Sequence, residues 1–367
     1  MKALNFFIKT VLSIAIVLFL ICSPFTLFTK IQTLNYAING EYSFSYTGIL
    51  ELWNVDTFEG GSVSRSAWLE KRAIEFEKQN KGTYIVVRNL TPEQLQLNLE
   101  SGNKPSLISF GIGVGELFYD KLITLNKTYS VRDDLKNSGK VKGKQKAIPI
   151  MLGGYSLISN GELCEQTDNL IEDFNKFNIK DKSNLGYGNK SYITPLLSLY
   201  CNSVTEISSV YDEVNEIDSY DCYDKFIRNN FVTLLGTQRD FYRCRNRENN
   251  MKMQNNSYYF LGGFSDLVQY MSVFKSDNKT EEMCENFIEF LTYEKTQQTL
   301  TNISMFSALN KNFYTDEYKD YASTLLKPLK TMNVFLTQSN INNLKELLND
   351  YYFNSKDVKN EINKYLS

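Results

Sequence analysis

At 367 residues the chain exceeds what one hydrophobic core usually supports, so two domains are expected. Its 42% hydrophobic and 22% charged residues exclude a disordered or fibrous protein, and a net charge of -2 argues against a nucleic-acid-binding one. The sequence contains no histidine, which removes the usual general base and the commonest metal ligand. An enzyme of this composition would depend on carboxylates, lysine or tyrosine.

The N-terminal segment has the pattern of an export signal. Lys2 and Lys9 precede an uncharged run over Thr10–Thr29, and Lys30 closes it. A basic flank followed by an apolar run directs export, and an uncharged run of roughly 18 or more residues can also span a membrane. We therefore expect residues 1–30 to be a signal peptide or membrane anchor, with the rest of the chain on the extracellular face of the membrane.

The cysteines give no motif. They are Cys22, Cys164, Cys201, Cys222, Cys244 and Cys284. No two have the CxxC spacing of zinc or redox sites, and buried free thiols are favoured over disulfides, although export would permit a disulfide. Cys22 follows the apolar run, so cleavage of the segment, lipidation at Cys22 and retention all stay open.

After a tether over residues 31–47, the pattern predicts a β-loop-α-β-α-β unit. An apolar strand over Ile49–Trp53 leads into a polar loop that ends at Gly61, and helical spacing of apolar residues follows over about Ser64–Gln79. A buried strand is expected at Tyr84–Val87. In such units the loops at the carboxyl ends of the strands line a ligand crevice.

The second half of this unit begins with a strong helix start. Thr91 can cap the helix, Pro92 suits its first position, and Gln94 stands at the capping-box site. Pro105 then leads into an apolar strand over Ser106–Phe110.

Three apolar runs, two of them with paired glycines, predict crossings between two lobes. They lie at Ala147–Ile158, Tyr258–Phe264 and Met305–Leu309. We therefore assign residues 48–152 plus 262–306 to lobe 1, and residues 153–261 plus 307–367 to lobe 2.

The second lobe is expected to carry helices near Leu170–Phe177, Thr194–Tyr200 and Asp221–Asn229. A buried strand over Phe231–Leu235 is then followed by the polar stretch Gly236–Asp240. That stretch is either a ligand-facing corner or a helix cap with a surface ion pair, and the sequence leaves both interpretations open.

Four stretches in this order resemble the extracellular solute-binding proteins of ABC importers, in the maltodextrin-binding-protein-like class. They are Gly48–Gly61, Asn103–Gly111, Ile148–Ile158, and Cys284–Gln298 with Phe306–Leu309. In the second stretch Ser106 replaces the aspartate that is frequent in this family. The resemblance implies an α/β protein with a two-lobe, periplasmic-binding-protein-like type II fold and three interlobe crossings. It further implies a monomer that captures a sugar or oligosaccharide between its lobes and delivers it to membrane permease subunits.

The resemblance implies no catalytic residue, no cofactor, no metal and no nucleic-acid partner. Mapped by motif, it places twelve residues at the ligand: Trp53, Asn54, Asp56, Phe58, Phe110, Tyr155, Tyr192, Thr237, Gln238, Arg239, Asp240 and Phe264. Aromatic faces with carboxylate, amide and guanidinium groups suit a sugar.

Three alternatives stay open. The ligand could be another solute, such as an anion near Arg239, a polyamine, or a metal ion such as ferric iron at Tyr258–Tyr259. The fold could instead serve a membrane-tethered sensor module without transport. Finally, Asp56 and Asp240 could be the two carboxylates of an extracellular glycoside hydrolase, if they lay about 5–9.5 Å apart.

Overall fold

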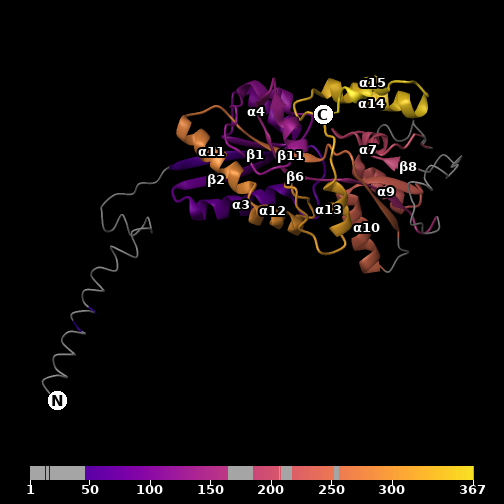
Figure 1. The fold of residues 1–367 in the computed structure, drawn as a ribbon, viewed down its shortest axis with the longest axis horizontal. Helices are drawn as coiled ribbons and strands as arrows, with labels where there is room; N and C mark the ends of the chain where they lie inside the picture. Colours follow the sequence, from indigo (N-terminus) through magenta and orange to yellow (C-terminus); the bar gives the residue numbers. More distant parts are fainter. Residues whose placement is uncertain are drawn as a thin grey trace, which may run out of the picture. The chain divides into compact units, whose positions relative to one another are not determined.

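The computed structural model describes Ser13, Ile16 and residues 46–163, 185–205, 207, 217–251 and 256–366. Cys22, Cys164, most of the expected export segment and tether, and the helix expected near Leu170–Phe177 lie outside these residues. Ile49–Phe76 and Tyr84–Ser367 form one compact unit that carries nearly all of two sheets (Figure 1). Within the described part of the chain, none of the helices is both long and apolar enough to cross a membrane.

The first lobe is built on a five-stranded sheet in the order β2-β1-β3-β11-β6. Its strands are β1 (Gly48–Val55), β2 (Thr83–Leu90), β3 (Leu107–Phe110), β6 (Ile148–Leu152) and β11 (Val268–Val273). β1 and β3 run parallel, as expected for strands joined through helices, whereas β11 returns from far along the chain and pairs antiparallel with β3 and β6.

Several helices belong to this lobe, and the first two form where the sequence predicts them. They are α3 (Arg65–Gln79), α4 (Pro92–Glu100), α11 (Asn278–Leu291) and the short α12 (Glu294–Gln298). The capping box is formed at α4: the Thr91 hydroxyl accepts from Gln94 N, and the Gln94 side chain accepts from Thr91 N. The strand predicted at 84–87 forms as part of β2, but it is not buried as expected, because Tyr84 is 61% and Val86 48% exposed. Their strand, β2, lies at the edge of the sheet, where one face stays open to water.

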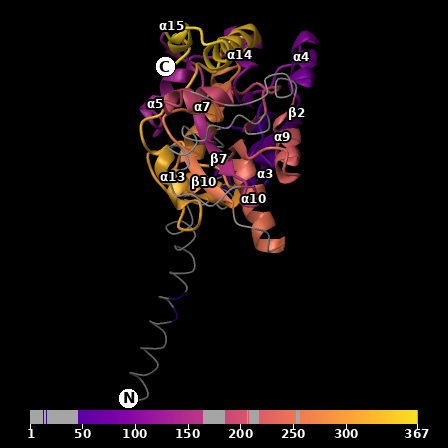
Figure 2. The same cartoon turned by 90° about the vertical axis from the view of Figure 1, so that its right-hand side faces the viewer.

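The second lobe is built on a four-stranded sheet in the order β10-β7-β9-β8. Its strands are β7 (Tyr155–Ser159), β8 (Leu185–Tyr187), β9 (Thr233–Thr237) and β10 (Ser257–Leu261). Its helices are α7 (Pro195–Cys201), α9 (Ser219–Ile227), α10 (Gln238–Met251) and α13 (Lys319–Leu325). α9 and α10 pack on β9, and α13 packs on β10 (Figure 2).

Three segments pass from one sheet to the other. β6 of the first sheet continues into β7 of the second through Gly153 and Gly154, and the chain returns between β10 and β11. The third segment passes Phe306, which pairs with Leu152 at the end of β6 before the chain reaches α13 on β10. The fold is therefore the two-lobe α/β arrangement with three crossings that the resemblance implies.

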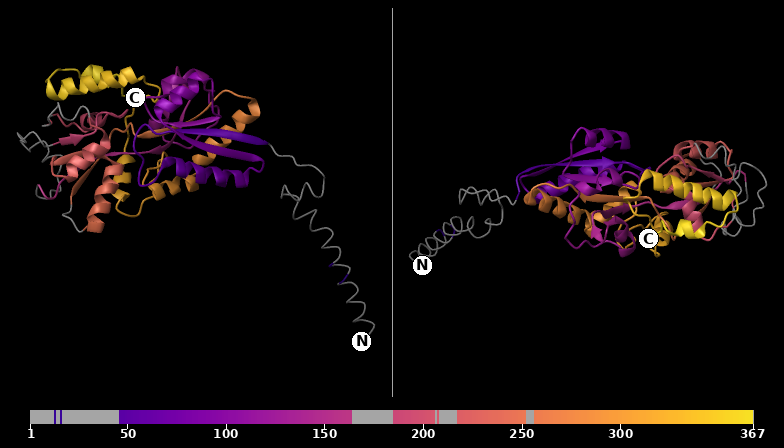
Figure 3. Two further views of the ribbon diagram at one scale, coloured as in Figure 1. Left: turned by 180° about the vertical axis from the view of Figure 1, so that it is seen from behind. Right: turned by 90° about the horizontal axis from the view of Figure 1, so that it is seen from above.

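The C-terminal helices α14 (Gln338–Phe353) and α15 (Lys359–Asn363), yellow in Figure 3, pack on each other and end the chain. α14 contacts both lobes. Gln338 N donates to the Glu116 carboxylate of the first lobe, and the Lys345 ammonium donates to the carbonyls of Asn189 and Ser191 in the second.

Candidate functional site

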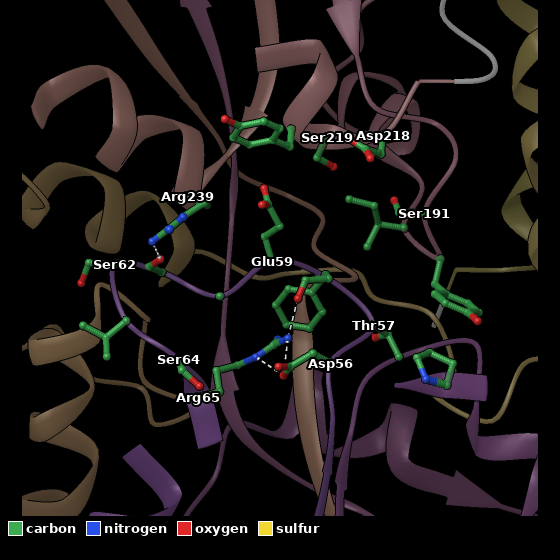
Figure 4. Close-up of a pocket in the computed structure, with 18 of the residues that line it drawn as sticks. Asp56, Thr57, Glu59, Ser62, Ser64, Arg65, Ser191, Asp218, Ser219 and Arg239 are labelled. Atoms are coloured by element: carbon green, nitrogen blue, oxygen red, sulfur yellow. Dashed lines mark hydrogen bonds and ion pairs between the residues drawn. The ribbon is translucent and has the colours of Figure 1, made fainter. Parts of the chain in front are cut away.

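A cavity of about 650 Å³ is lined by segments of both lobes (Figure 4). This volume is in the range of small-molecule sites in proteins. The first lobe contributes residues 56–65 and Pro92 with Glu93, and the second contributes residues 191–193, Asp218–Tyr220 and Arg239. The first set follows β1 or begins α4, and the second set precedes α7 or begins α9 and α10. The cavity is thus built from loops and helix starts.

The loop after β1 forms one wall of the cavity. It packs closely against the backbone just before the third crossing. Ser62 N donates to the Ile303 carbonyl at 2.9 Å. A Cβ atom on Gly61 would lie 1.9 Å from that same carbonyl oxygen, which no side chain tolerates. Glycine at position 61 is therefore required for this wall.

Arg65, the first residue of α3, contacts this loop through its side chain. Its Nε and Nη2 bond to Asp56 at 3.0 and 2.8 Å, its Nη2 also donates to the Phe58 carbonyl, and its guanidinium stacks on the Phe58 ring at 3.9 Å. Arg65 is 1% exposed. Burial lowers the pKa of its guanidinium, and the Asp56 carboxylate opposes this shift.

The opposite wall, residues 191–193, is held by two charged residues, the half-buried Lys345 and the buried Asp266. Lys345 donates to carbonyls of this segment, and burial lowers its pKa to about 8. Asp266, in the second crossing, accepts from Thr194 N at 2.7 Å, from Thr194 Oγ1 at 2.8 Å and from the Tyr155 hydroxyl at 2.6 Å. Burial raises the pKa of Asp266, while these hydrogen bonds lower it.

At positions 236–240 the structure forms a helix start rather than an open loop. Thr237 ends β9 and Gln238 begins α10. The Asp240 carboxylate accepts a hydrogen bond from Thr237 N at 2.9 Å, so it caps the helix. A helix cap was one of the two interpretations that the sequence left open. The ion pair of Asp240 is buried, however, and not at the surface as that interpretation expected.

An ion triad joins the loop after β1 to α10. Arg243 of α10 binds the Glu59 carboxylate through Nη1 at 2.9 Å and Nη2 at 2.6 Å, and its Nη1 also bonds to Asp240 at 3.1 Å. Arg239 adds a hydrogen bond to the Gly61 carbonyl. These bonds run from α10 of the second lobe to the β1 loop of the first.

Asp240 should give the protein a measurable pH dependence. Burial and the nearby Glu59 raise its pKa from 3.8 to about 6, although Arg243 opposes the shift. Because the folded-state pKa lies above the unfolded one, Asp240 favours folding below about pH 4, and this contribution is lost as the pH rises through 6. The unfolding free energy of Asp240→Asn minus that of the wild type should therefore increase by up to about 3 kcal/mol as the pH rises from 3.5 to 7. Urea denaturation of both proteins across this range tests it, and parallel profiles would contradict it.

Four of the twelve predicted ligand residues line the cavity: Asp56, Phe58, Tyr192 and Arg239. The other eight do not line it and are at most 3% exposed: Trp53, Asn54, Phe110, Tyr155, Thr237, Gln238, Asp240 and Phe264. They lie behind the walls, where Gln238, for example, donates to the Glu59 carbonyl at 3.3 Å.

Motif mapping missed several residues that line the cavity. They include Thr57, Glu59, Arg65, Glu93, Ser191, Asp218 and Tyr220. Helix N-caps in the sequence could have indicated some of these residues. Thr91 caps α4, and Asp218 caps α9 by accepting a hydrogen bond from Asp221 N at 2.8 Å. Helix starts that follow strands lie at the carboxyl edge of a sheet, where ligands bind.

Among the described residues, no group of three or more acidic or cysteine side chains is placed to hold a metal ion. The four described cysteines, Cys201, Cys222, Cys244 and Cys284, are free.

No protein-family model matches this sequence, and comparison with curated proteins gives no match either. Solved structures do match over most of the chain. The cyclic alpha-maltosyl-1,6-maltose binding protein from Arthrobacter globiformis is 10% identical, with a TM-score of 0.57, and the match covers 87% of this chain and 97% of that one. The sugar-binding protein MalE from Xanthomonas citri is 10% identical, with a TM-score of 0.59, and the match covers 87% and 95%.

The chain has the fold of the maltose-binding proteins. A third match of this fold, the Thermus thermophilus maltotriose binding protein, is 13% identical, with a TM-score of 0.52, and covers 82% of this chain and 93% of its own. At the level of the fold, these matches confirm the resemblance to maltodextrin-binding-protein-like solute-binding proteins. The three matched proteins are named as binding proteins.

Proposed function

We propose that this protein is the extracellular sugar-binding component of an ABC importer. The observation that carries the proposal is the cavity of about 650 Å³ lined by both lobes, in a fold shared with proteins that bind maltose-type sugars. A ligand that contacts both walls stabilises the arrangement in which they face each other, because it gains contacts only there. The closed protein then docks on permease subunits.

The chemistry of the cavity supports a sugar. Tyr192 and Tyr220 offer aromatic faces to the C–H surfaces of a sugar ring, and Ser64 and Ser219 offer hydroxyls to its oxygen atoms. The export pattern of residues 1–30 supports a position on the outer face of the membrane, held there by the N-terminal segment or by lipidation at Cys22.

The two carboxylates considered for hydrolysis, Asp56 and Asp240, do not support that reaction. Asp240 lies behind the wall at 2% exposure, bonded to Arg243. Asp56 is held by the buried Arg65. A glycoside hydrolase needs two carboxyl groups that face the same bond, and this pair does not offer that arrangement.

Thermal-shift and calorimetric titration of the purified full-length protein tests the proposal. The panel is maltotriose, cellotriose, trigalacturonate, a polyamine, an amino-acid mixture and phosphate. A ligand present at 100 times its dissociation constant should stabilise the protein by about 2.7 kcal/mol. No response to any saccharide would contradict the proposal, and a response to the polyamine or phosphate alone would favour a binder of another solute.

A further inference from the structure

Three residues of α10, in the second lobe, bond to the loop after β1 in the first. Gln238 Nε2 donates to the Glu59 carbonyl at 3.3 Å, and Arg239 donates to the Gly61 carbonyl (Figure 4). Arg243 holds the Glu59 carboxylate with two hydrogen bonds, of 2.9 and 2.6 Å. These bonds tie the lobes together in the arrangement that the structure shows, which we call the closed arrangement.

The three bonds lie at increasing distances from the first crossing. Gln238 is fully buried, and its Oε1 accepts a hydrogen bond from Gly154 N of that crossing at 3.1 Å. Arg243 lies about 7.5 Å further along α10, at about 1.5 Å per residue. Displacement in a hinged rotation grows with distance from the hinge, so the pair between Arg243 and Glu59 should break first when the lobes separate.

Two carboxylates share Arg243, and they belong to different lobes. Arg243 Nη1 also bonds to Asp240 at 3.1 Å, and Asp240 lies on the same helix as Arg243. Separation of the lobes therefore removes Glu59 but leaves Asp240 beside the guanidinium. With two carboxylates and one guanidinium, the closed triad carries one negative charge in excess, and a proton on Asp240 neutralises it.

Closure changes the proton affinity of Asp240. Burial and the nearby Glu59 raise its pKa to about 6, and Arg243 opposes this shift. The repulsion from Glu59 exists only while the lobes are closed, so their separation lowers the proton affinity of Asp240 again. By linkage, a proton that binds the closed arrangement more tightly must favour that arrangement.

The other titratable groups that interact with Asp240 in the described part of the chain keep one protonation state across this range. They are Cys222 and Tyr223 of α9, Cys244 of α10 and Tyr321 of α13. Burial raises the pKa of each of these thiols and phenols, that of Tyr223 to about 12. All four therefore stay neutral while Asp240 titrates.

We propose that Arg243 and Glu59 form a latch that holds the lobes closed, and that protonation of Asp240 strengthens this latch in an acidic medium. The protein then closes more readily, and holds its ligand more tightly, as the pH falls. Arg243 and Asp240 do not line the cavity, so they act as positioning residues through Glu59. This inference rests on the proposed function, because it assigns a control of closure to the same site.

Spin labels at Leu97 of α4 and Arg228 of α9 can report the separation of the lobes. Both side chains are exposed, at 62% and 70%, and attachment through non-canonical amino acids leaves the native cysteines unchanged. Double electron–electron resonance of the ligand-free full-length protein in detergent micelles gives the populations of short and long distances. In the wild type, their ratio should rise about threefold to fivefold from about pH 7.5 to pH 5, if closure raises the pKa by about half to one unit.

Two substitutions test the latch itself. Glu59→Gln removes the charge that pairs with Arg243, and it should fold because the Glu59 side chain is 33% exposed. It should lower the short-distance population at both pH values and lose most of the pH response. Asp240→Asn imitates the protonated carboxyl group, so it should keep the short-distance population high at both pH values.

Glu317→Gln is the matched control. Glu317 also pairs with an arginine of α10, Arg245, at 2.8 Å, and its side chain is 36% exposed. Glu317 lies next to α13, which packs on β10 of the second sheet, so this pair does not join the lobes. The substitution should leave the wild-type distances and their pH response unchanged.

The outcomes separate this inference from the proposed function. The latch is overturned if Glu59→Gln keeps the wild-type distance populations, if Glu317→Gln shifts them as much, or if the short distance becomes rarer in acid. The distance measurements need no ligand, so they do not depend on the saccharide panel. A wild type that responds to no saccharide contradicts the proposed function alone, whereas a sugar-binding wild type with an unchanged Glu59→Gln variant overturns the latch alone.

Discussion

Trp53→Ala should destabilise the protein by about 3–5 kcal/mol, because it leaves a large cavity in the core of the first lobe. Trp53 is 1% exposed, and it belongs to the buried cluster that also contains Val55 and Ile108. Its indole N–H donates to Glu51 at 2.9 Å, so the one polar atom of the ring is already satisfied. Neither the ring nor the N–H is presented to the ligand cavity.

Urea denaturation of the ligand-free protein measures this loss. Tyr220→Ala is the matched control, because Tyr220 is an aromatic residue that lines the cavity and is 57% exposed. That variant should change the unfolding free energy by less than about 1 kcal/mol and should weaken sugar binding instead. A Trp53→Ala protein with wild-type stability but lost affinity would reverse these roles and make Trp53 a ligand platform.

Arg243→Met should lower the stability of the protein by a comparable amount, because it breaks the ion triad. It removes the guanidinium that pairs with Asp240, whose side chain is 2% exposed, and it also releases Glu59, whose side chain is 33% exposed. Breaking a buried pair by removing one partner costs about 3–5 kcal/mol, since the other charge stays buried and unpaired. Most of the loss should come from Asp240, because water can solvate Glu59 in part.

A double substitution identifies the cause. Arg243→Met combined with Asp240→Asn should recover much of the lost stability, because the unpaired charge is then gone. Arg228→Met is the control: Arg228 pairs with Asp224 but is 70% exposed, so its loss should cost no more than about 0.5 kcal/mol. Additive effects of the two substitutions at positions 243 and 240 would show that the triad is not coupled.

Local signals predicted much of the fold. The capping box at Thr91 and the start of α4 formed as expected, since both depend on residues within one helical turn. The three crossings were also predictable, because paired glycines and apolar runs mark chain segments that are buried between two sheets. The edge position of β2 was not, because the β-loop-α-β-α-β pattern does not say that β2 and β3 pair on opposite sides of β1, which leaves β2 without a second neighbour.

The site was less predictable for a physical reason. Trp53 and Phe110 lie near the carboxyl ends of β1 and β3, where ligands bind. Both side chains are nevertheless buried in the hydrophobic core. Proximity to a strand end does not say which way a side chain points. Ser191 lines the cavity, and its carbonyl accepts a hydrogen bond from Lys345, more than 150 residues later in the sequence. No local pattern encodes such a contact.

The position of Asp266 has a mechanical consequence. This carboxylate lies in the segment that returns the chain from the second sheet to the first, and it bonds both Tyr155 at the start of β7 and Thr194 beside the 191–193 wall. Any rotation of the lobes that twists this segment must pull on that wall. We therefore expect the opening angle and the shape of the binding surface to change together, so that a partly open protein presents a different binding surface and not merely a wider gap.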